Sequence, residues 1–184
     1  MPGAVPEVVM DRVSSLTALP EAGYQIPAGA GIGHAHLKVS SLERAIEFYC
    51  GVLGFNLVAR YRDTAAFVAA GDYHHHLGLN TWESLGAGPP PPHHTGLYHV
   101  AIRYPSRRDL AVAVKRVRDA GIPLRGASDH GVSVSIYLSD PDGIGLELTW
   151  DRPAEEWPRT PSGEVDLRMA DPFDLDALIA EAGS

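Results

Sequence analysis

The fold is decided by the stretch Gly33-His34-Ala35-His36-Leu37-Lys38-Val39, which lies near the start of the chain. Read as a strand, it directs its aliphatic side chains to one face and two histidines and a lysine to the other. The pattern returns in Tyr98-His99-Val100-Ala101-Ile102-Arg103, and in Gly145-Leu146-Glu147-Leu148-Thr149-Trp150 a glutamate takes the polar face. Two imidazoles and one carboxylate, each on the polar face of an apolar strand, are what a facial metal triad needs. Such a triad leaves coordination positions open, which suits Fe(II) and oxygen chemistry.

The composition is that of a globular protein without a nucleic-acid or membrane partner. Of the 184 residues, 45% are hydrophobic and 21% are charged, which allows one domain or two small modules that share a core. The formal net charge of -8 argues against nucleic acid and anionic membranes as partners. We expect no membrane span and no signal peptide. The single Cys50 excludes an internal disulfide, so a cytoplasmic location is expected.

The chain repeats one plan, because His34 and His99 lie 65 residues apart (34 to 99) and each begins a similar unit. In each unit a strand is followed by a helix and then by three strands. The helices are predicted at residues 42–53 and 107–120, and a glycine follows each of them. The later strands are expected at residues 55–61, 64–69, 74–82, 123–127, 132–139 and 145–150.

These patterns predict the organisation of the whole chain. Its parts are a lead-in (1–31), a first βαβββ module (32–82), a proline-rich linker (83–96), a second βαβββ module (97–152) and a C-terminal arm with a short helix (153–184). The linker contains Pro89 to Pro92, which cannot donate ladder hydrogen bonds and so interrupt the sheet. Val8 to Leu19 is expected to form a short helix, and the C-terminal arm is expected to pack on the surface.

Two such units resemble the vicinal oxygen chelate superfamily, which includes glyoxalases, bleomycin resistance proteins and extradiol dioxygenases. Within it the chain is similar to the catechol 2,3-dioxygenase-like branch. The segments that carry this resemblance are residues 33–39, 74–82 (His-His-His-Leu-Gly-Leu-Asn-Thr-Trp), 129–133 (Asp-His-Gly-Val-Ser), 137–147 (beginning Tyr-Leu-Ser-Asp-Pro-Asp-Gly), 151–153 and 156–158. The resemblance implies an α+β fold in which the two modules pair into a cup-shaped, barrel-like mixed sheet with a metal at its centre.

The resemblance also implies roles for particular residues. His34, His99 and Glu147 fall on the positions that bind Fe(II), or sometimes Mn(II), in extradiol enzymes. His76 matches a histidine that moves protons beside the metal, and strand parity directs it into the cup. The run His74-His75-His76 leaves the register open by one residue, although parity favours His74 or His76. Tyr137, ten residues before Glu147, matches a tyrosine that hydrogen-bonds the metal-bound substrate oxygen. His130 is either an additional donor to the pocket or a turn residue.

Gly78 separates the alternative functions. By module alignment it takes the place in the first unit that Glu147 takes in the second, whereas glyoxalase-type isomerases have a ligand at both places. The first reading is therefore an extradiol dioxygenase that cleaves a catechol-type aromatic with O2. The alternatives are another metal-dependent enzyme of this scaffold, such as a lyase, isomerase or thiol transferase, and a metal-free protein that binds an aromatic or an antibiotic. Larger extradiol enzymes carry four modules, so the tail or a second subunit of a homo-oligomer would have to close the pocket here.

Overall fold

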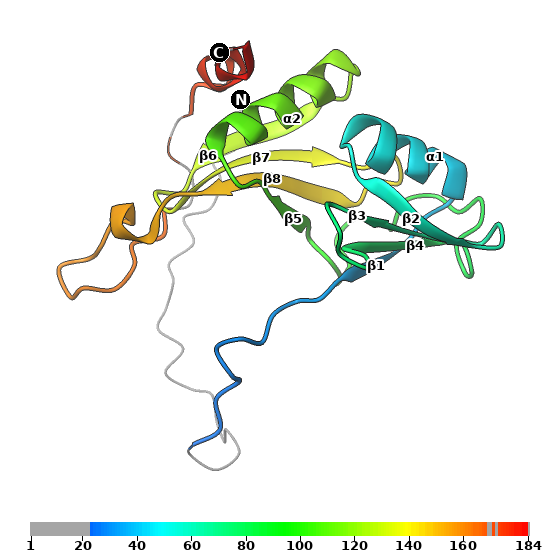
Figure 1. Cartoon of the computed structure of the whole chain (residues 1–184), viewed down its shortest axis with the longest axis horizontal. Helices are drawn as coiled ribbons and strands as arrows, with labels where there is room; N and C mark the ends of the chain where they lie inside the picture. Colours follow the sequence, from blue (N-terminus) through cyan, green and yellow to red (C-terminus); the bar gives the residue numbers. More distant parts are fainter. Residues whose placement is uncertain (1–22, 169–170, 172, 184) are drawn as a thin grey trace. The chain divides into compact units, whose positions relative to one another are not determined.

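A computed structural model describes residues 23–168, 171 and 173–183 of the chain (Figure 1). The chain divides into two compact units, residues 1–32 and residues 33–184, and the second unit contains every strand of the described part. In the first unit the backbone N–H of Ala30 donates to the carbonyl of Pro27 at 2.8 Å, which closes a turn. The helix expected from Val8 to Leu19 lies outside the described residues.

The first module forms a four-stranded sheet with its strands in the order β1-β4-β3-β2. Strands β1 and β4 pair in parallel, and the other neighbours pair antiparallel. The elements are β1 (Ala35–Lys38), α1 (Leu42–Ile46), a π-helix η1 (Glu47–Val52), β2 (Asn56–Tyr61), β3 (Ala65–Ala69) and β4 (Leu77–Asn80).

The second module repeats this topology in the order β5-β8-β7-β6, again with one parallel pair, β5 and β8. Its elements are β5 (Val100–Arg103), α2 (Arg107–Asp119), β6 (Leu124–Asp129), β7 (Ser133–Ser139) and β8 (Gly145–Asp151). After it come the short helices η2 (Ala154–Glu156), α3 (Leu175–Ala180) and η3 (Glu181–Gly183). The predicted α+β arrangement of two βαβββ units is confirmed.

Hydroxyl caps and glycines set the ends of the helices. The Oγ atoms of Ser41 and Ser106 accept hydrogen bonds from backbone N–H groups in the first turns of α1 and α2. Gly54 and Gly121 follow the two helical segments with positive φ, as expected of residues that end a helix. The first helix differs from the expected single α-helix, because it widens into a π-helix from Glu47 onward.

The core lies on the aliphatic face of the strands, as their alternation predicts. Leu37 and Val39 of the opening stretch are buried, while His36 and Lys38 are exposed. Figure 1 shows α1 and α2 on the same side of the sheets, and one continuous hydrophobic cluster joins them to both modules. The polar faces of the strands thus remain available for a site. Among the described residues, no helix combines the length and apolarity needed to cross a bilayer.

The strand pairings relate the two modules residue by residue. Gly78 of β4 pairs with His36 on one side and Phe67 on the other, whereas Glu147 of β8 pairs with Ala101 and Tyr137. The places of Gly78 and Glu147 are therefore equivalent in the repeat. By the same correspondence His34 is equivalent to His99, and each lies immediately before the first strand of its module.

Candidate metal and substrate site

The centre of the candidate site is a contact between His99 and Glu147, whose Nε2 and Oε2 atoms lie 2.8 Å apart. The parallel pairing of β5 with β8 brings the two residues together, since Ala101 lies opposite Glu147. Gly145 makes the close approach possible, because a Cβ atom there would lie 2.1 Å from the carbonyl oxygen of Tyr98.

The His99 ring is held with one nitrogen in the protein interior. Its Nδ1 atom is buried and has no hydrogen-bond partner among the described residues. A neutral imidazole nitrogen beside a carboxylate oxygen is a donor pair that suits a divalent cation such as Fe(II), Mn(II) or Zn(II).

Tyr137 and His130 extend this pair into a chain of hydrogen bonds. The Tyr137 hydroxyl lies 3.4 Å from Oε1 of Glu147 and 2.7 Å from Nε2 of His130. His130 Nδ1 lies 2.7 Å from the carbonyl oxygen of Arg168, which can only accept, so Nδ1 carries a proton. Nε2 of a neutral His130 therefore accepts a hydrogen bond from the Tyr137 hydroxyl. A protonated His130 instead donates to the Tyr137 oxygen and frees that proton for Glu147.

Burial keeps Tyr137 in its phenol form. Desolvation raises the pKa of its hydroxyl, and the negative charge of Glu147 raises it further. At neutral pH this hydroxyl can donate one hydrogen bond and accept another. It therefore links two groups that can each take up or release a proton.

The C-terminal arm fixes the turn that carries His130. Gly131 has positive φ, and a Cβ atom there would lie 2.8 Å from Cγ of Pro158, so the arm packs directly on the turn. Asp129 accepts the Gly131 N–H at 2.8 Å and forms an ion pair with Arg152. The sequence predicted only that the arm packs on the surface. It did not predict that the Arg168 carbonyl fixes the tautomer of His130, because side-chain patterns do not reveal a backbone acceptor.

His34 does not join the His99–Glu147 pair in this structure. Its ring packs on that of His75, with the ring centroids 4.4 Å apart. Within the described residues, no three histidine, cysteine or acidic side chains come close enough together to hold a metal ion. The structure thus assembles two of the three expected ligands and leaves the third on the neighbouring module.

In the structure His76 lies against Ala70 and Tyr73. Nδ1 of His76 accepts the backbone N–H of Ala70 at 3.2 Å, and its ring lies 4.7 Å from that of Tyr73. His75 instead lies beside Phe67, with 5.1 Å between ring centroids, on the face that also carries His34. Strand β4 begins only at Leu77, and bends at residues 74 and 76 precede it, so strict alternation does not extend to these histidines.

His36 occupies the space that a fourth ligand would need. A Cβ atom on Gly78 would lie 2.9 Å from three atoms of the His36 ring. A carboxylate at position 78 would therefore require His36 to move. Desolvation lowers the pKa of His36, as does the nearby His34, so its ring is neutral at neutral pH.

The candidate ligands are of the kinds that bind a divalent metal, although only two of the three lie together. His99 and Glu147 already converge, and His34 is the residue at the equivalent place of the other module. The fold and this site define the chain as a protein of paired βαβββ modules with an asymmetric histidine–carboxylate centre.

Comparison with known proteins gives the family. The profile of the Glyoxalase/Bleomycin resistance protein/Dioxygenase superfamily matches residues 31–148. The chain therefore belongs to this superfamily, also called the vicinal oxygen chelate superfamily, as the sequence predicted.

Curated relatives include dioxygenases and lyases. The chain is 39% identical over 153 residues to the catechol-2,3-dioxygenase of Bacillus subtilis (83% of this chain, 52% of that protein). It is 30% identical over 148 residues to the biphenyl-2,3-diol 1,2-dioxygenase 3 of Rhodococcus globerulus (80% and 74%). A probable lactoylglutathione lyase of Synechocystis is 29% identical over 132 residues (62% and 91%). The chain thus spans about half the length of the Bacillus relative.

Solved structures share the fold. A glyoxalase/dioxygenase from Nostoc punctiforme matches with a TM-score of 0.58 at 20% identity, over 73% of this chain and 100% of that one. A lactoylglutathione lyase from Agrobacterium tumefaciens matches with a TM-score of 0.51 at 22% identity, over 68% and 96%. These likenesses support the fold only, because one scaffold hosts several activities.

Proposed function

We propose that the chain is a metal-dependent extradiol dioxygenase that cleaves the ring of a catechol-type aromatic, with His34, His99 and Glu147 as metal ligands. The observation that carries this proposal is the His99–Glu147 pair backed by the hydroxyl of Tyr137 and the imidazole of His130. The similarity to two dioxygenases, whose names describe aromatic diols, supports the same chemistry.

The metal would be Fe(II), or Mn(II), and would act as a template and electron conduit for the reaction of a catechol with O2. Glu147 would contribute the anionic ligand, and His99 an imidazole nitrogen. Tyr137 lies against Glu147, where its hydroxyl can hold the substrate oxygen by a hydrogen bond. His130 can take the proton of that hydroxyl at Nε2, because its Nδ1 proton is committed to the Arg168 carbonyl.

A second proton carrier is needed on the side of the first module. The sequence assigned this task to His76, but His75 is the histidine that lies beside His34 and Phe67. We therefore assign the proton transfer beside the substrate to His75. An imidazole suits this task because its pKa lies close to the working pH.

A lactoylglutathione lyase is the second candidate, because this chain matches 91% of the length of the Synechocystis relative but only about half of the Bacillus dioxygenase. Against it stands position 78, where the repeat would place a fourth ligand. Gly78 offers none, and His36 fills the space above it. We therefore rank the lyase below the dioxygenase.

The test is oxygen uptake by protein that has been purified without oxygen and loaded with Fe(II). A panel of catechols is supplied, and the yellow ring-opened product is followed by absorbance. The dioxygenase proposal expects oxygen use and product in equal amounts with at least one catechol. Iron-loaded protein that uses no oxygen with any catechol, but isomerises the hemithioacetal of methylglyoxal and glutathione, would replace it with the lyase.

A further inference from the structure

A cavity of about 350 Å³ lies where the two modules meet, and none of the candidate metal-site residues lines it. Its apolar wall consists of Phe48 from η1, Ile122 and Pro123 from the segment between α2 and β6, and Pro141 from the turn between β7 and β8. Small-molecule sites have volumes of about 300–1,000 Å³ and are mostly apolar, with a few polar groups. The cavity therefore has the size and the lining to take a small apolar ring.

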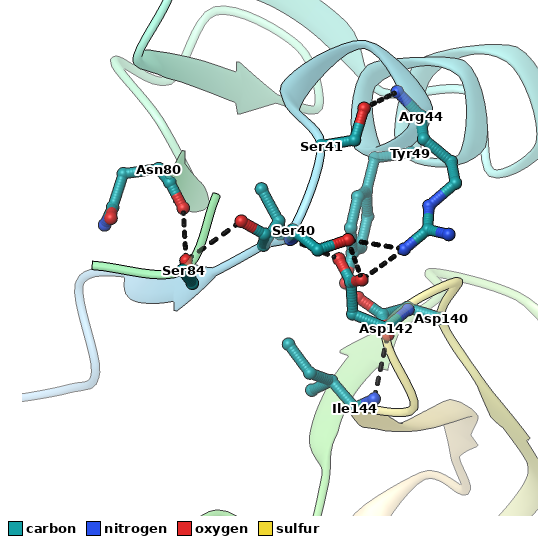
Figure 2. A network of polar contacts seen from close by, with 10 residues as sticks. Ser40, Ser41, Arg44, Tyr49, Asn80, Ser84, Asp140, Asp142 and Ile144 are labelled. Atoms are coloured by element: carbon teal, nitrogen blue, oxygen red, sulfur yellow. Dashed lines mark hydrogen bonds and ion pairs between the residues drawn. The ribbon is translucent and has the colours of Figure 1, made fainter. Parts of the chain in front are cut away.

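Polar contacts between the modules hold the walls of this cavity together (Figure 2). Asp142 accepts the backbone N–H of Ser40 at 2.9 Å and also forms an ion pair with Arg44. Asp140, which lines the cavity, accepts the hydroxyl of the fully buried Tyr49 at 3.0 Å. Because these contacts join the first module to the second, the cavity is formed without a ligand, and little ordering is needed on binding.

Arg125 supplies a charge without a partner to this lining. The pairing of β6 with β7 shifts register between Leu124 and Gly126, so Arg125 has no partner residue on β7, and such irregularities re-aim a side chain. Within the described residues every other arginine has at least one interaction partner, whereas Arg125 has none. A guanidinium in this state suits a carboxylate, which it can bind through two parallel hydrogen bonds.

Ser139 is a second polar group in the same cavity. Its Oγ atom is buried and has no hydrogen-bond partner among the described residues. A buried hydroxyl without a partner is costly, and a carboxylate in the cavity would be an acceptor for it. The lining thus has two groups that a bound carboxylate could satisfy.

Asp140 is the one acidic residue of the lining, and its carboxylate is already occupied. Oδ1 accepts the backbone N–H groups of Asp142 and Ile144 at 2.9 and 2.8 Å, and Oδ2 accepts the Tyr49 hydroxyl (Figure 2). These three donors offset its charge, which reduces its repulsion of a second carboxylate. Arg125 is therefore left as the charge that selects the ligand.

We infer that this cavity is a binding site for an aromatic monocarboxylate, with the carboxylate on Arg125 and the ring against Phe48 and the two prolines. An aromatic ring is favoured because Phe48 can pack on it edge to face or with an offset stack. The inference does not depend on the proposed function, because no proposed metal ligand or proton carrier takes part. It does require both features together, so neither a carboxylate without a ring nor a ring without a charge should bind as well.

The experiment follows ¹H–¹⁵N NMR spectra of the full chain while benzoate is added. We expect benzoate to shift the amide signals of Ile122, Arg125 and Ser139, with a dissociation constant of about 1 mM, which lies within the affinity that so few atoms can supply. Acetate lacks the ring and benzamide lacks the charge, so each should bind about tenfold more weakly or worse. Benzamidine has a similar shape but a positive charge, and it should leave these signals unchanged.

A pair of variants separates the proposed contact from general attraction of an anion. Arg125→Gln removes the unpaired charge, so its affinity for benzoate should fall to that of the wild type for benzamide. Arg62→Gln is the matched control, because it removes the same charge from an exposed arginine that does not line the cavity. This control should bind benzoate as the wild type does.

Several results would overturn the inference. One is the absence of any shift at Ile122, Arg125 and Ser139 when benzoate reaches about 20 times the expected dissociation constant. Another is a set of shifts that centres on His99 and Glu147 instead, which would place the ligand in the candidate metal site. Equal affinity of Arg125→Gln and wild type would remove the role of the charge, and acetate binding as tightly as benzoate would remove the role of the apolar wall.

Discussion

Nε2 of His99 lies 2.8 Å from Oε2 of Glu147, although the two residues come from opposite ends of the second module. The contact needs no long side chains, because the parallel pairing of β5 and β8 sets both residues on neighbouring backbones. It also draws on Gly145, without which the backbone at Tyr98 could not come so close. The candidate site thus depends as much on backbone geometry as on its chemical groups.

Glu147→Gln tests the anionic ligand. A neutral amide is a poor replacement for a carboxylate on a divalent cation, so the affinity for Mn(II) should fall strongly. We expect a loss beyond the roughly 10- to 100-fold that follows removal of a group which only supports a ligand. Glu155→Gln, an exposed residue of the arm, is the control and should bind as the wild type does. Equal affinity in the two variants would contradict the assignment of Glu147.

His75→Phe and His76→Phe form a pair that separates neighbouring histidines. His75 lies beside His34, whereas His76 accepts a hydrogen bond from the backbone at Ala70. General acid–base groups contribute about 10²- to 10⁴-fold in rate. We expect His75→Phe to lose catechol turnover on that scale and still bind metal, while His76→Phe stays close to wild type. Stopped-flow absorbance of the product measures both, and the reverse result would restore the assignment to His76.

Gly145→Ala tests the close approach of the backbones. The new methyl group would meet the Tyr98 carbonyl oxygen at 2.1 Å and the His99 Cβ at 3.2 Å. Overpacking of this kind costs about 1–3 kcal/mol in the free energy of unfolding. Gly126→Ala in β6 is the control, because a Cβ atom there meets nothing within 4 Å. Urea unfolding compares the two, and equal stability would show that the approach of Tyr98 to β8 is not required.

The carboxyl of Asp140 should make stability depend on pH. Burial raises its pKa above the ordinary value of 3.8 and outweighs the hydrogen bonds that it accepts. A carboxyl with a raised pKa in the folded state contributes stability that is present below its unfolded pKa and is lost as the pH rises through the folded pKa. Asp140→Asn does not titrate, so its stability relative to wild type should increase from acidic pH towards neutrality.

The measurement is urea unfolding of both proteins over that pH range. The difference between the two free energies of unfolding isolates Asp140 from the other carboxyls, which titrate in both. If the free energy of unfolding of Asp140→Asn, relative to that of wild type, stays constant or falls as the pH rises, Asp140 ionises in the folded state at least as easily as in the unfolded chain.

Alternation and repetition were enough to predict the order of strands and helices along the chain, whereas their pairing into mixed sheets was implied by the family resemblance. In strands such as β1 and β8 the aliphatic side chains face the core, so a shift by one residue would move them to the polar face, and the register is strongly specified there. The equivalence of Gly78 with Glu147 could be predicted for the same reason. These predictions hold wherever the strand is regular.

Prediction ended where the backbone departs from regular geometry. Bends at residues 74 and 76 interrupt the alternation, and His75 is the histidine of this run whose ring lies beside those of His34 and Phe67. No side-chain pattern marks where a bend replaces a strand. The contact between Ser40 and Asp142 joins residues about 100 positions apart, and its partners are ordinary cap and turn residues when read locally. The π-helix at Glu47 likewise keeps an apolar spacing close to that of an α-helix.

The occupation of position 78 by glycine has a consequence for how a substrate can approach. A centre with a carboxylate at the equivalent place of each module would offer the same group from both modules. With Glu147 on one module and the His36 ring over Gly78 on the other, that equivalence is lost. One side of the centre therefore carries Glu147 and the other carries the His36 ring, so a ligand with two unlike oxygens would meet a different group on each side. The two repeated modules therefore present different groups to a bound ligand.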